Sequence, residues 1–336
     1  MSSPDLYNKR FVLFTGKGGV GKTAMASAFA LSCAQRGERT LLIELNVKDK
    51  VSSLFGAQHV GTEIVEVDEN LYAVNITPAA AMEEYALMIL KVKLIYRAVF
   101  ENRVVRSFLR VIPGLNELVM LGKAYFHVME TNAQGKPVWD KVIIDAPATG
   151  HGIFFLQIPS VITSVVGSGL MFDEARRIEE LLQDSERTAL ALVTLPEEMP
   201  VNETLMLRDV IRDKLKMPIG CVIANAVYRP LFDDNESAWL DEASKAAEAA
   251  RAAEAGSVNA SLGGLIEAGR FRAGRVRLQQ HYIARLEAEL DLPMLRVPYY
   301  FMDRMSFAII HEMAADLERQ LGPGAPNKSN LTKSVG

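Results

Sequence analysis

The chain has 336 residues, a formal net charge of -4 and an isoelectric point near 5.9. This balance lacks the clustered basic face that nonspecific nucleic-acid binding requires, so nucleic acid is not an expected partner. No apolar run approaches the roughly 20 residues that span a bilayer, and residues 1–10 (MSSPDLYNKR) lack the apolar core of a signal peptide. We therefore expect a cytoplasmic protein without an integral membrane segment, built as one large α/β domain with insertions.

The first motif follows an apolar run, Phe11 to Phe14, and precedes a helical pattern over Lys22 to Gln35. Its glycines let backbone N–H groups curl around phosphate oxygens, and the helix directs its positive dipole end at the same anion. Lys22 would meet the β- and γ-phosphates, while the Thr23 hydroxyl would bind Mg²⁺. The predicted nucleotide-binding residues are Gly16, Lys17, Gly18, Gly19, Val20, Gly21, Lys22, Thr23 and Ala24.

After a helix stop at Gly37, Thr40 to Leu45 (TLLIEL) has the composition of a buried parallel strand. Residues 46–56 (NVKDKVSSLFG) follow at its carboxyl end, where open α/β sheets bind their ligands. This order places residues 46–56 in the switch I position beside the nucleotide.

Leu71 to Ile76 is the next predicted strand, and Thr77-Pro78 opens a helix over Ala79 to Phe100. Two interpretations of this amphipathic helix stay open: one wall of a groove for a client or partner, or a helix packed on its neighbours. Its apolar side recurs at three- and four-residue spacings, at Met82, Tyr85, Ile89, Val92 and Tyr96. Further helices are predicted over 103–111 and 115–130, with Pro113-Gly114 between them.

Asp140 to Asp145 (DKVIID) is a predicted strand that ends in an acid, and APATGH (146–151) follows it. The order of strand, acid and glycine is that of a Walker B strand followed by switch II. Asp145 is predicted to hold Mg²⁺ through a water, and Gly150 lets the backbone approach a γ-phosphate. The alternative is an aspartate that merely caps a turn.

The second half of the chain continues the alternation of strands and helices. Strands are predicted over 187–195, 219–225 and 292–297, and helices over 174–184, 201–216, 240–255, 274–290 and 304–321. Residues 256–269 carry several glycines and serines, so we expect a flexible connection there. Residues 322–336 are expected to form a disordered tail.

Polar and aromatic residues end two of these strands. The amide of Asn225 has the donor and acceptor needed to read an adenine edge, with an Asx-turn as the alternative. Pro298 and Tyr299 follow the last strand, in a loop predicted to lie at the nucleotide edge. Cys33 and Cys221 lie in apolar runs far apart, so we predict that both pack in the core rather than pair or bind zinc.

Taken together, GKGGVGKT, IPGLNEL (112–118), DAPATGH, VTLPEEMPVNET (193–204), VIAN and VPYYF resemble the ArsA-type anion-transporting ATPase family. That family includes the arsenite-efflux ATPase and the targeting factor for tail-anchored membrane proteins. The resemblance covers about residues 10–321 and implies an α/β fold with a doubly wound, mostly parallel sheet of the deviant Walker A class. It also implies one domain over 1–321, ATP with Mg²⁺, and a helical subdomain that opens and closes with nucleotide state. Residues 79–131 would form that subdomain, and a contribution from 232–290 stays open.

The resemblance also assigns roles to single residues. In the family the early lysine, here Lys17, reaches across a dimer interface to the partner's nucleotide, which implies a homodimer or a heterodimer with a paralogue. Lys22 and Thr23 match the deviant P-loop, Asp145 matches the Walker B acid, and Asn225 matches the adenine-reading asparagine. Thr149, Gly150 and His151 match switch II. Because a thiolate pair is missing, arsenite binding and an intersubunit zinc are not expected.

The family's switch I begins DPAH, and its aspartate orients the attacking water. An ungapped alignment puts Asn46 at that position, and an amide positions water without taking its proton. We therefore predict slow hydrolysis, with Asp49 as the substitute acid; Glu44 is less favoured because the sheet holds its backbone.

The preferred interpretation is a dimeric ATPase whose nucleotide state controls the binding of a protein client on the helical subdomain. One alternative is a nucleotide-dependent switch or scaffold, acting as half of a heterodimer with a competent paralogue. Another is a surface-positioning ATPase, although the tail lacks the amphipathic helix that such proteins place on membranes.

Overall fold

The computed structural model describes residues 5–90, 114–147, 149–252 and 260–322. Its centre is an eight-stranded sheet in the order β3-β4-β2-β5-β1-β6-β7-β8. Neighbouring strands run parallel, except that β3 is antiparallel to β4. This confirms the α/β class with a mostly parallel sheet. The strands are β1 (Phe11–Thr15), β2 (Thr40–Leu45), β3 (Val65–Asp68), β4 (Leu71–Ile76), β5 (Lys141–Asp145), β6 (Thr188–Thr194), β7 (Ile219–Val227) and β8 (Met294–Pro298).

Helices cover both faces of the sheet. One face carries α1 (Lys22–Gln35), α2 (Val51–Phe55) and α12 (Phe307–Leu321). The other carries α6 (Leu115–Met129), α7 (Thr149–Val165), α8 (Leu170–Gln183), α9 (Glu198–Asp209), the π-helix η1 (Val210–Leu215) and the end of α11 (Ala260–Leu290). The remaining helices are α3 (Pro78–Leu90) and α10 (Asp234–Ala252).

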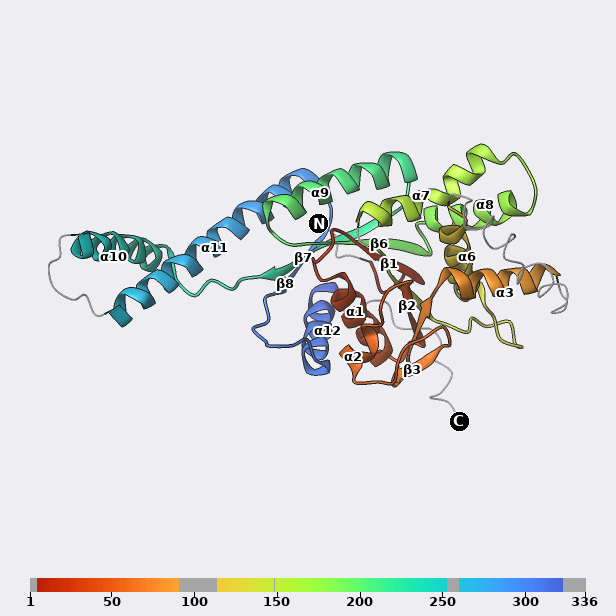
Figure 1. Ribbon diagram of the computed structural model, residues 1–336, viewed down its shortest axis with the longest axis horizontal. Coiled ribbons are helices and arrows are strands. Elements are labelled where there is room, and N and C mark those ends of the chain that lie inside the picture. Colours follow the sequence, from red (N-terminus) through yellow and green to blue (C-terminus); the bar gives the residue numbers. More distant parts are fainter. Residues whose placement is uncertain (1–4, 91–113, 148, 253–259, 323–336) are drawn as a thin grey trace.

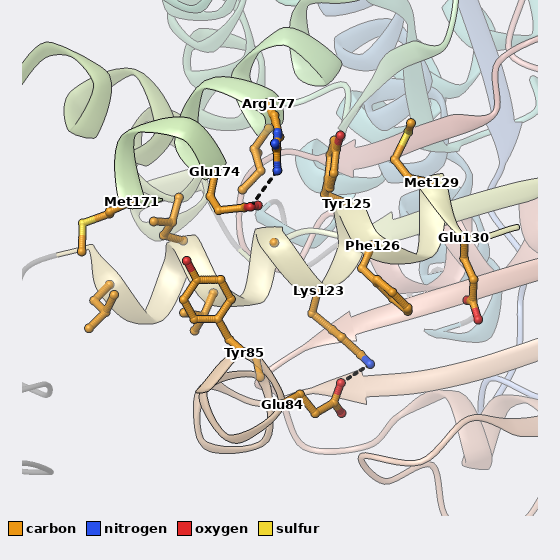
Figure 2. Close-up of a pocket in the computed structure, with 16 residues that line it drawn as sticks. Glu84, Tyr85, Lys123, Tyr125, Phe126, Met129, Glu130, Met171, Glu174 and Arg177 are labelled. Atoms are coloured by element: carbon orange, nitrogen blue, oxygen red, sulfur yellow. Dashed lines mark hydrogen bonds and ion pairs between the residues drawn. The ribbon is translucent and has the colours of Figure 1, made fainter. Parts of the chain in front are cut away.

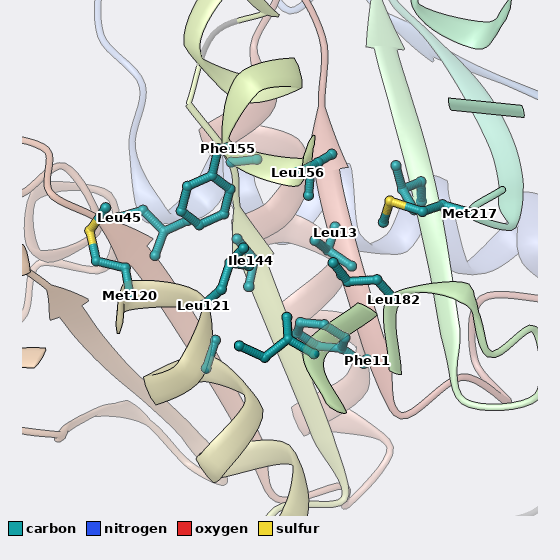
Figure 3. Close-up of a cluster of buried hydrophobic side chains, with 14 of the residues drawn as sticks. Phe11, Leu13, Leu45, Met120, Leu121, Ile144, Phe155, Leu156, Leu182 and Met217 are labelled. Atoms are coloured by element: carbon teal, nitrogen blue, oxygen red, sulfur yellow. The ribbon is translucent and has the colours of Figure 1, made fainter. Parts of the chain in front are cut away.

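The two faces have separate cores because successive strand side chains point to opposite sides. In β1, Val12 and Phe14 pack toward α1, whereas Phe11 and Leu13 pack toward α6, α7 and α8. Figure 3 shows Phe11 and Leu13 with Leu121, Ile144 and Phe155 in this second core. A strand buried on both sides must be apolar throughout, which is why these strands read as continuous apolar runs.

The two ends of the sheet carry different helical extensions. Figure 1 shows α10 and the first half of α11 projecting as a hairpin from the β8 end, while α3, α6 and α8 gather near the opposite end. Among the described residues, each helix is too short or too polar to cross a membrane.

The strand and helix predictions hold to within a few residues in most of the chain, but 256–269 is a correction. From residue 260 onward this segment is part of the long helix α11 and not a flexible connection. A Cβ on Gly269 would lie 3.1 Å from the Leu240 side chain, so this glycine permits close packing of α10 on α11. Three elements were not predicted: β3, α2 and α7. The predicted helix over 79–100 is described only to Leu90, and 103–111 and 323–336 lie outside the described residues.

Candidate functional site

The P-loop joins β1 to α1 in the middle of the sheet, between β5 and β6. Two of its glycines have positive φ and no room for a side chain. A Cβ on Gly16 (φ 150°) would lie 2.1 Å from the Val193 carbonyl oxygen, and one on Gly21 (φ 94°) would lie 2.3 Å from Asn225 Nδ2. The loop therefore requires glycine at both positions.

The lysine and threonine at the start of α1 are held by nearby oxygens. The buried Lys22 ammonium donates to the Lys17 carbonyl oxygen at 3.0 Å, inside the loop that would surround the phosphates. Burial lowers the pKa of Lys22, and the nearby Asp145 partly opposes this effect. The Thr23 hydroxyl donates to Asp145 Oδ2 at 2.6 Å, so the P-loop and the Walker B strand meet.

Asp145 and Thr23 suit a Mg²⁺ ion. Burial raises the pKa of Asp145, although Thr23, Lys22 and Lys50 oppose the rise. Asp145 Oδ1 is buried and has no hydrogen-bond partner in the described structure. An unpartnered carboxylate oxygen beside a hydroxyl fits a hydrated magnesium, which takes one or two protein oxygens together with water and phosphate. No group of three or more acidic, histidine or cysteine side chains that could hold a metal occurs in the described ranges.

The end of β2 carries two of the predicted switch I residues. Asn46 has a left-handed backbone (φ 49°), and its N–H donates to the Ile76 carbonyl oxygen at 2.9 Å. Asp49 accepts hydrogen bonds from the N–H groups of Ser52 (3.0 Å) and Val60 (2.9 Å), and His59 Nδ1 lies 2.7 Å from Oδ2. Partial burial raises the pKa of Asp49, but these bonds outweigh it and hold the pKa below its usual value. Asp49 thus ties the start of α2 to residues 59 and 60.

Glu44 is the buried acid of this region, and the sequence ranked it behind Asp49. Its side chain is fully buried, and its Cα is the register partner of Asp145 on β5. Oε1 accepts the Lys50 N–H at 3.2 Å. Burial raises the pKa of Glu44 to about 7, and Asp49 and Asp145 add to the rise while the Lys50 bond opposes it.

Lys17, which the family resemblance assigns to a partner's nucleotide, pairs within its own chain. Its Nζ lies 2.6 Å from Glu203 Oε1 on α9, with both side chains about one-third exposed. Glu203 lies in the VTLPEEMPVNET stretch after β6. The sequence singled out both segments, but only the fold brings them together.

Asn225, on β7, joins this strand to the P-loop through a side-chain hydrogen bond. Its Nδ2 donates to the Val20 carbonyl oxygen at 2.8 Å, and its Oδ1 accepts the Ala226 N–H at the same distance. Pro298 ends β8, and the N–H of Tyr299 donates to the Val227 carbonyl oxygen at 2.9 Å. The Tyr299 ring lies 4.9 Å from Tyr228, at the same edge of the sheet. The adenine-reading role of Asn225 stays a prediction.

Comparison with known proteins agrees with this geometry. Residues 9–171 match the family described as Anion-transporting ATPase. The ATPase BagA of Mycobacterium tuberculosis is 28% identical over 320 residues, which cover 93% of each chain. An arsenical pump-driving ATPase of Escherichia coli is 30% identical over 209 residues, covering 57% of this chain and 35% of that one. These matches support the ArsA-type ATPase family for this chain. This confirms the resemblance drawn from the motifs.

A second feature of the structure is a cavity of about 470 Å³ between α3, α6 and α8. Its wall is mostly apolar, and Figure 2 shows Tyr85, Phe126, Met129 and Met171 around it. Charged residues at the cavity are paired: Lys123 with Glu84, and Arg177 with Glu174 at 3.0 Å. The full lining is Ala81, Glu84, Tyr85, Leu115, Leu118, Val119, Gly122, Lys123, Tyr125, Phe126, Met129, Glu130, Met171, Glu174, Arg177 and Ile178.

The sequence foresaw only part of this cavity. Tyr85 belongs to the predicted amphipathic helix, but the side chain of Ile89 and all of Val92 lie outside what the structure describes. The contribution of α8 was missed, because its residues follow α6 by some 40 positions and no local signal links them.

The two cysteines are buried in the core on the α1 face, which confirms the predicted packing role. Burial raises the pKa of Cys221 to about 12 and moves the pKa of Cys33 in the same direction. Both thiols therefore stay protonated and inert near neutral pH.

Proposed function

We propose that this protein is a Mg-ATP-dependent ATPase that dimerises across its nucleotides and binds an apolar protein segment at the cavity between α3, α6 and α8. One observation carries the coupling between the two sites. α7 begins at Thr149, four residues after Asp145, and packs on both α8 and α6. A change at switch II thus has a rigid path to two walls of the cavity.

The fit at the helix junction supports this path. A Cβ on Gly114, at the N-cap of α6, would lie 2.5 Å from the Ile158 side chain of α7. Such close packing leaves α6 and α7 little room to move independently, because protein interiors transmit strain rather than absorb it. A shift of α7 relative to the sheet therefore moves α6 or α8 and changes the shape of the cavity.

At the nucleotide, the chain's own residues bind and orient. Lys22 would exchange the Lys17 carbonyl for phosphate oxygens, and the N–H groups of the first turn of α1 would donate hydrogen bonds to the same phosphates. Thr23 and Asp145 would hold Mg²⁺, which when bound would neutralise phosphate charge. The amide at Asn46, where the family has an acid, supports hydrolysis slower than an aspartate at that position would give.

The Lys17–Glu203 pair bears on dimerisation. A lysine held by its own α9 cannot also reach a partner's nucleotide, so the pair must open when a dimer forms. A partly exposed ion pair contributes about 0–1 kcal/mol, which a phosphate contact readily offsets. This supports a monomer without ATP and a dimer with it.

The cavity indicates the class of client. Its volume lies within the range of about 300–1,000 Å³ that is usual for ligand pockets. Since its charged groups are already paired and its wall is apolar, the occupant must be apolar. The space suits the side chains from a turn or two of an apolar helix rather than a whole membrane span.

Two measurements test the proposal together. Sedimentation of the purified protein with Mg-ATP, with Mg-ADP and without nucleotide should give a dimer only with ATP. A fluorescent apolar helical peptide should then bind with an affinity that differs between the two nucleotides. A nucleotide-independent monomer would contradict the sandwich dimer, and equal peptide affinity in all three states would contradict the coupling.

A further inference from the structure

Glu44 is a buried acid with one carboxylate oxygen that is not hydrogen-bonded in the described part of the chain. Its side chain is fully buried, yet Oε2 has no hydrogen-bond partner in the part of the chain that the structure describes. Buried polar atoms are nearly always paired, and a lone carboxylate oxygen in an apolar setting is costly. An unpaired buried atom therefore calls for an explanation, such as a water, an ion or a catalytic role.

The register of the sheet places this oxygen at the reaction edge. Glu44 and Asp145 are Cα partners on the parallel strands β2 and β5, so their side chains leave the sheet on the same side. That side carries α1, because Leu42 and Ile143, two residues before them, pack in the α1 core. Thr23 at the start of α1 already contacts Asp145.

Asp49, the other acid considered for switch I, already uses both of its carboxylate oxygens in hydrogen bonds. Both carboxylate oxygens of Asp49 receive hydrogen bonds from the start of α2 and from residues 59 and 60. Moving Asp49 toward a phosphate would break all of these contacts. Glu44 Oε2 can accept a water while Oε1 keeps its hydrogen bond from Lys50.

We propose that Glu44 is a catalytic residue that supplies the carboxylate which the family places at position 46. Oε2 accepts a hydrogen bond from the attacking water and holds it in line with the γ-phosphorus. The water oxygen bonds to phosphorus as the bond to the β,γ-bridging oxygen breaks. ADP leaves with that electron pair, and the water proton ends on the released phosphate. This assignment rests on the proposed ATPase function.

The position of Glu44 explains how it can compensate for the amide at position 46, where the family has an aspartate. Glu44 lies two residues before Asn46, which follows the end of β2 with a left-handed backbone (φ 49°), and glutamate is one bond longer than aspartate. The longer side chain recovers part of the distance that the earlier position loses.

Glu44→Gln is the direct test, since it keeps the size of the side chain and replaces the carboxylate with a neutral amide. The ATP dissociation constant should change by less than about threefold, while kcat should fall by at least about 10²-fold. Adding Asn46→Asp to that variant should restore kcat by about tenfold or more. Unchanged kcat in Glu44→Gln, or a rise in the Mg²⁺ requirement with kcat intact, would overturn the assignment.

Stability without nucleotide gives a readout independent of turnover. If Glu44 is held for catalysis, Glu44→Gln should raise or keep the melting temperature, because it removes a buried charge near Asp145 and Asp49. A lower melting temperature would show that Glu44 stabilises the fold and would overturn the proposal. Glu38→Gln is the matched control: Glu38 is also buried but lies 3.4 Å from Lys141, so its loss should lower the melting temperature and leave kcat unchanged.

The same measurements distinguish the proposed ATPase function from the role of Glu44. A wild-type protein that fails to bind ATP would contradict the proposed function itself. ATP binding and hydrolysis that are indifferent to residue 44 would remove only the role of Glu44.

Discussion

The carboxyl edge of the sheet and the cavity between α3, α6 and α8 leave opposite kinds of groups unsatisfied. At the edge, buried polar atoms lack partners in the described structure, among them Glu44 Oε2, Asp145 Oδ1 and Asn75 Oδ1. At the cavity, the charges are paired and apolar side chains are left exposed. This contrast fits the proposed function, in which a polar ligand binds at the edge and an apolar one in the cavity.

One helix, α7, joins these two unlike regions. α7 starts at the polar edge and runs into the apolar end, where α6 and α8 pack on it. Phe155 and Ile158 of α7 are buried in the same core as Leu118 and Val119, which line the cavity. Variants that damage one site should therefore leave binding at the other intact while abolishing its response to nucleotide.

The largest effect should come from Lys22→Ala at the polar edge. A charged hydrogen bond is worth about 1.5–3 kcal/mol, so losing the phosphate contacts of Lys22 should weaken Mg-ATP binding by at least ten- to hundredfold and abolish turnover. Isothermal titration with Mg-ATP measures the affinity. Apolar peptide should still bind, but its affinity should no longer respond to ATP; a persistent response would contradict the α7 coupling.

Lys17→Ala should separate dimerisation from binding. The monomer loses only the Lys17–Glu203 pair, so ATP affinity should stay within a few-fold, while ATP-dependent dimerisation and hydrolysis should fall by an order of magnitude or more. Sedimentation velocity with Mg-ATP measures the dimer. Glu203→Gln, which frees Lys17, should instead favour dimerisation by up to about fivefold, the equivalent of an exposed ion pair. Equal dimerisation by all three proteins would exclude an intersubunit lysine.

Phe126→Ser tests the apolar side. Phe126 is 49% exposed at the cavity, so its replacement should cost little stability but weaken peptide binding by about tenfold through lost apolar contact. Phe271→Ser is the matched control, because Phe271 is 72% exposed on α11, away from the cavity. If both variants bind peptide equally well, the peptide does not use the cavity. ATP affinity should be unchanged in both.

Asp49→Ala should destabilise the switch region. Removing a carboxylate that accepts the N–H groups of Ser52 and Val60 leaves both donors without their acceptor, at about 1–3 kcal/mol in unfolding free energy. Urea denaturation without nucleotide measures the loss. A variant as stable as wild type would show that Asp49 is not a structural tie and would return it to consideration as the acid of switch I.

The smallest effect concerns pH at His127, a buried residue of α6. Burial lowers its pKa below the usual 6.5 and Lys123 lowers it further, while Glu130 and Glu84 oppose. A depressed pKa means that protonation favours the unfolded chain, so stability should fall as pH drops below 6.5, by at most about 1.4 kcal/mol per unit. His127→Gln should flatten this part of the stability profile. Parallel profiles for the two proteins would show that His127 does not titrate on unfolding.

The sequence by itself determined the P-loop, the Walker B strand, the family and nearly all of the parallel strands. These depend on neighbouring residues: glycines beside Lys22 and Thr23, an acid at the end of an apolar run, and strands so deeply buried that composition alone marks them. The helix over Lys22–Gln35 and the strands over Thr40–Leu45 and Leu71–Ile76 agree in both bounds.

Only the tertiary structure decided which distant residues meet. The sequence favours Asp49 over Glu44, because the sheet holds the backbone of Glu44. In the structure, however, the strand register puts Glu44 beside Asp145, and the carboxylate of Asp49 is already bound to the N–H groups of Ser52 and Val60. The Lys17–Glu203 pair joins residues that are remote in the chain, and Gly269 of α11, in a segment predicted to be flexible, permits close packing on α10. Long-range contacts carry no local periodicity, so their chemistry becomes visible only once the chain has folded.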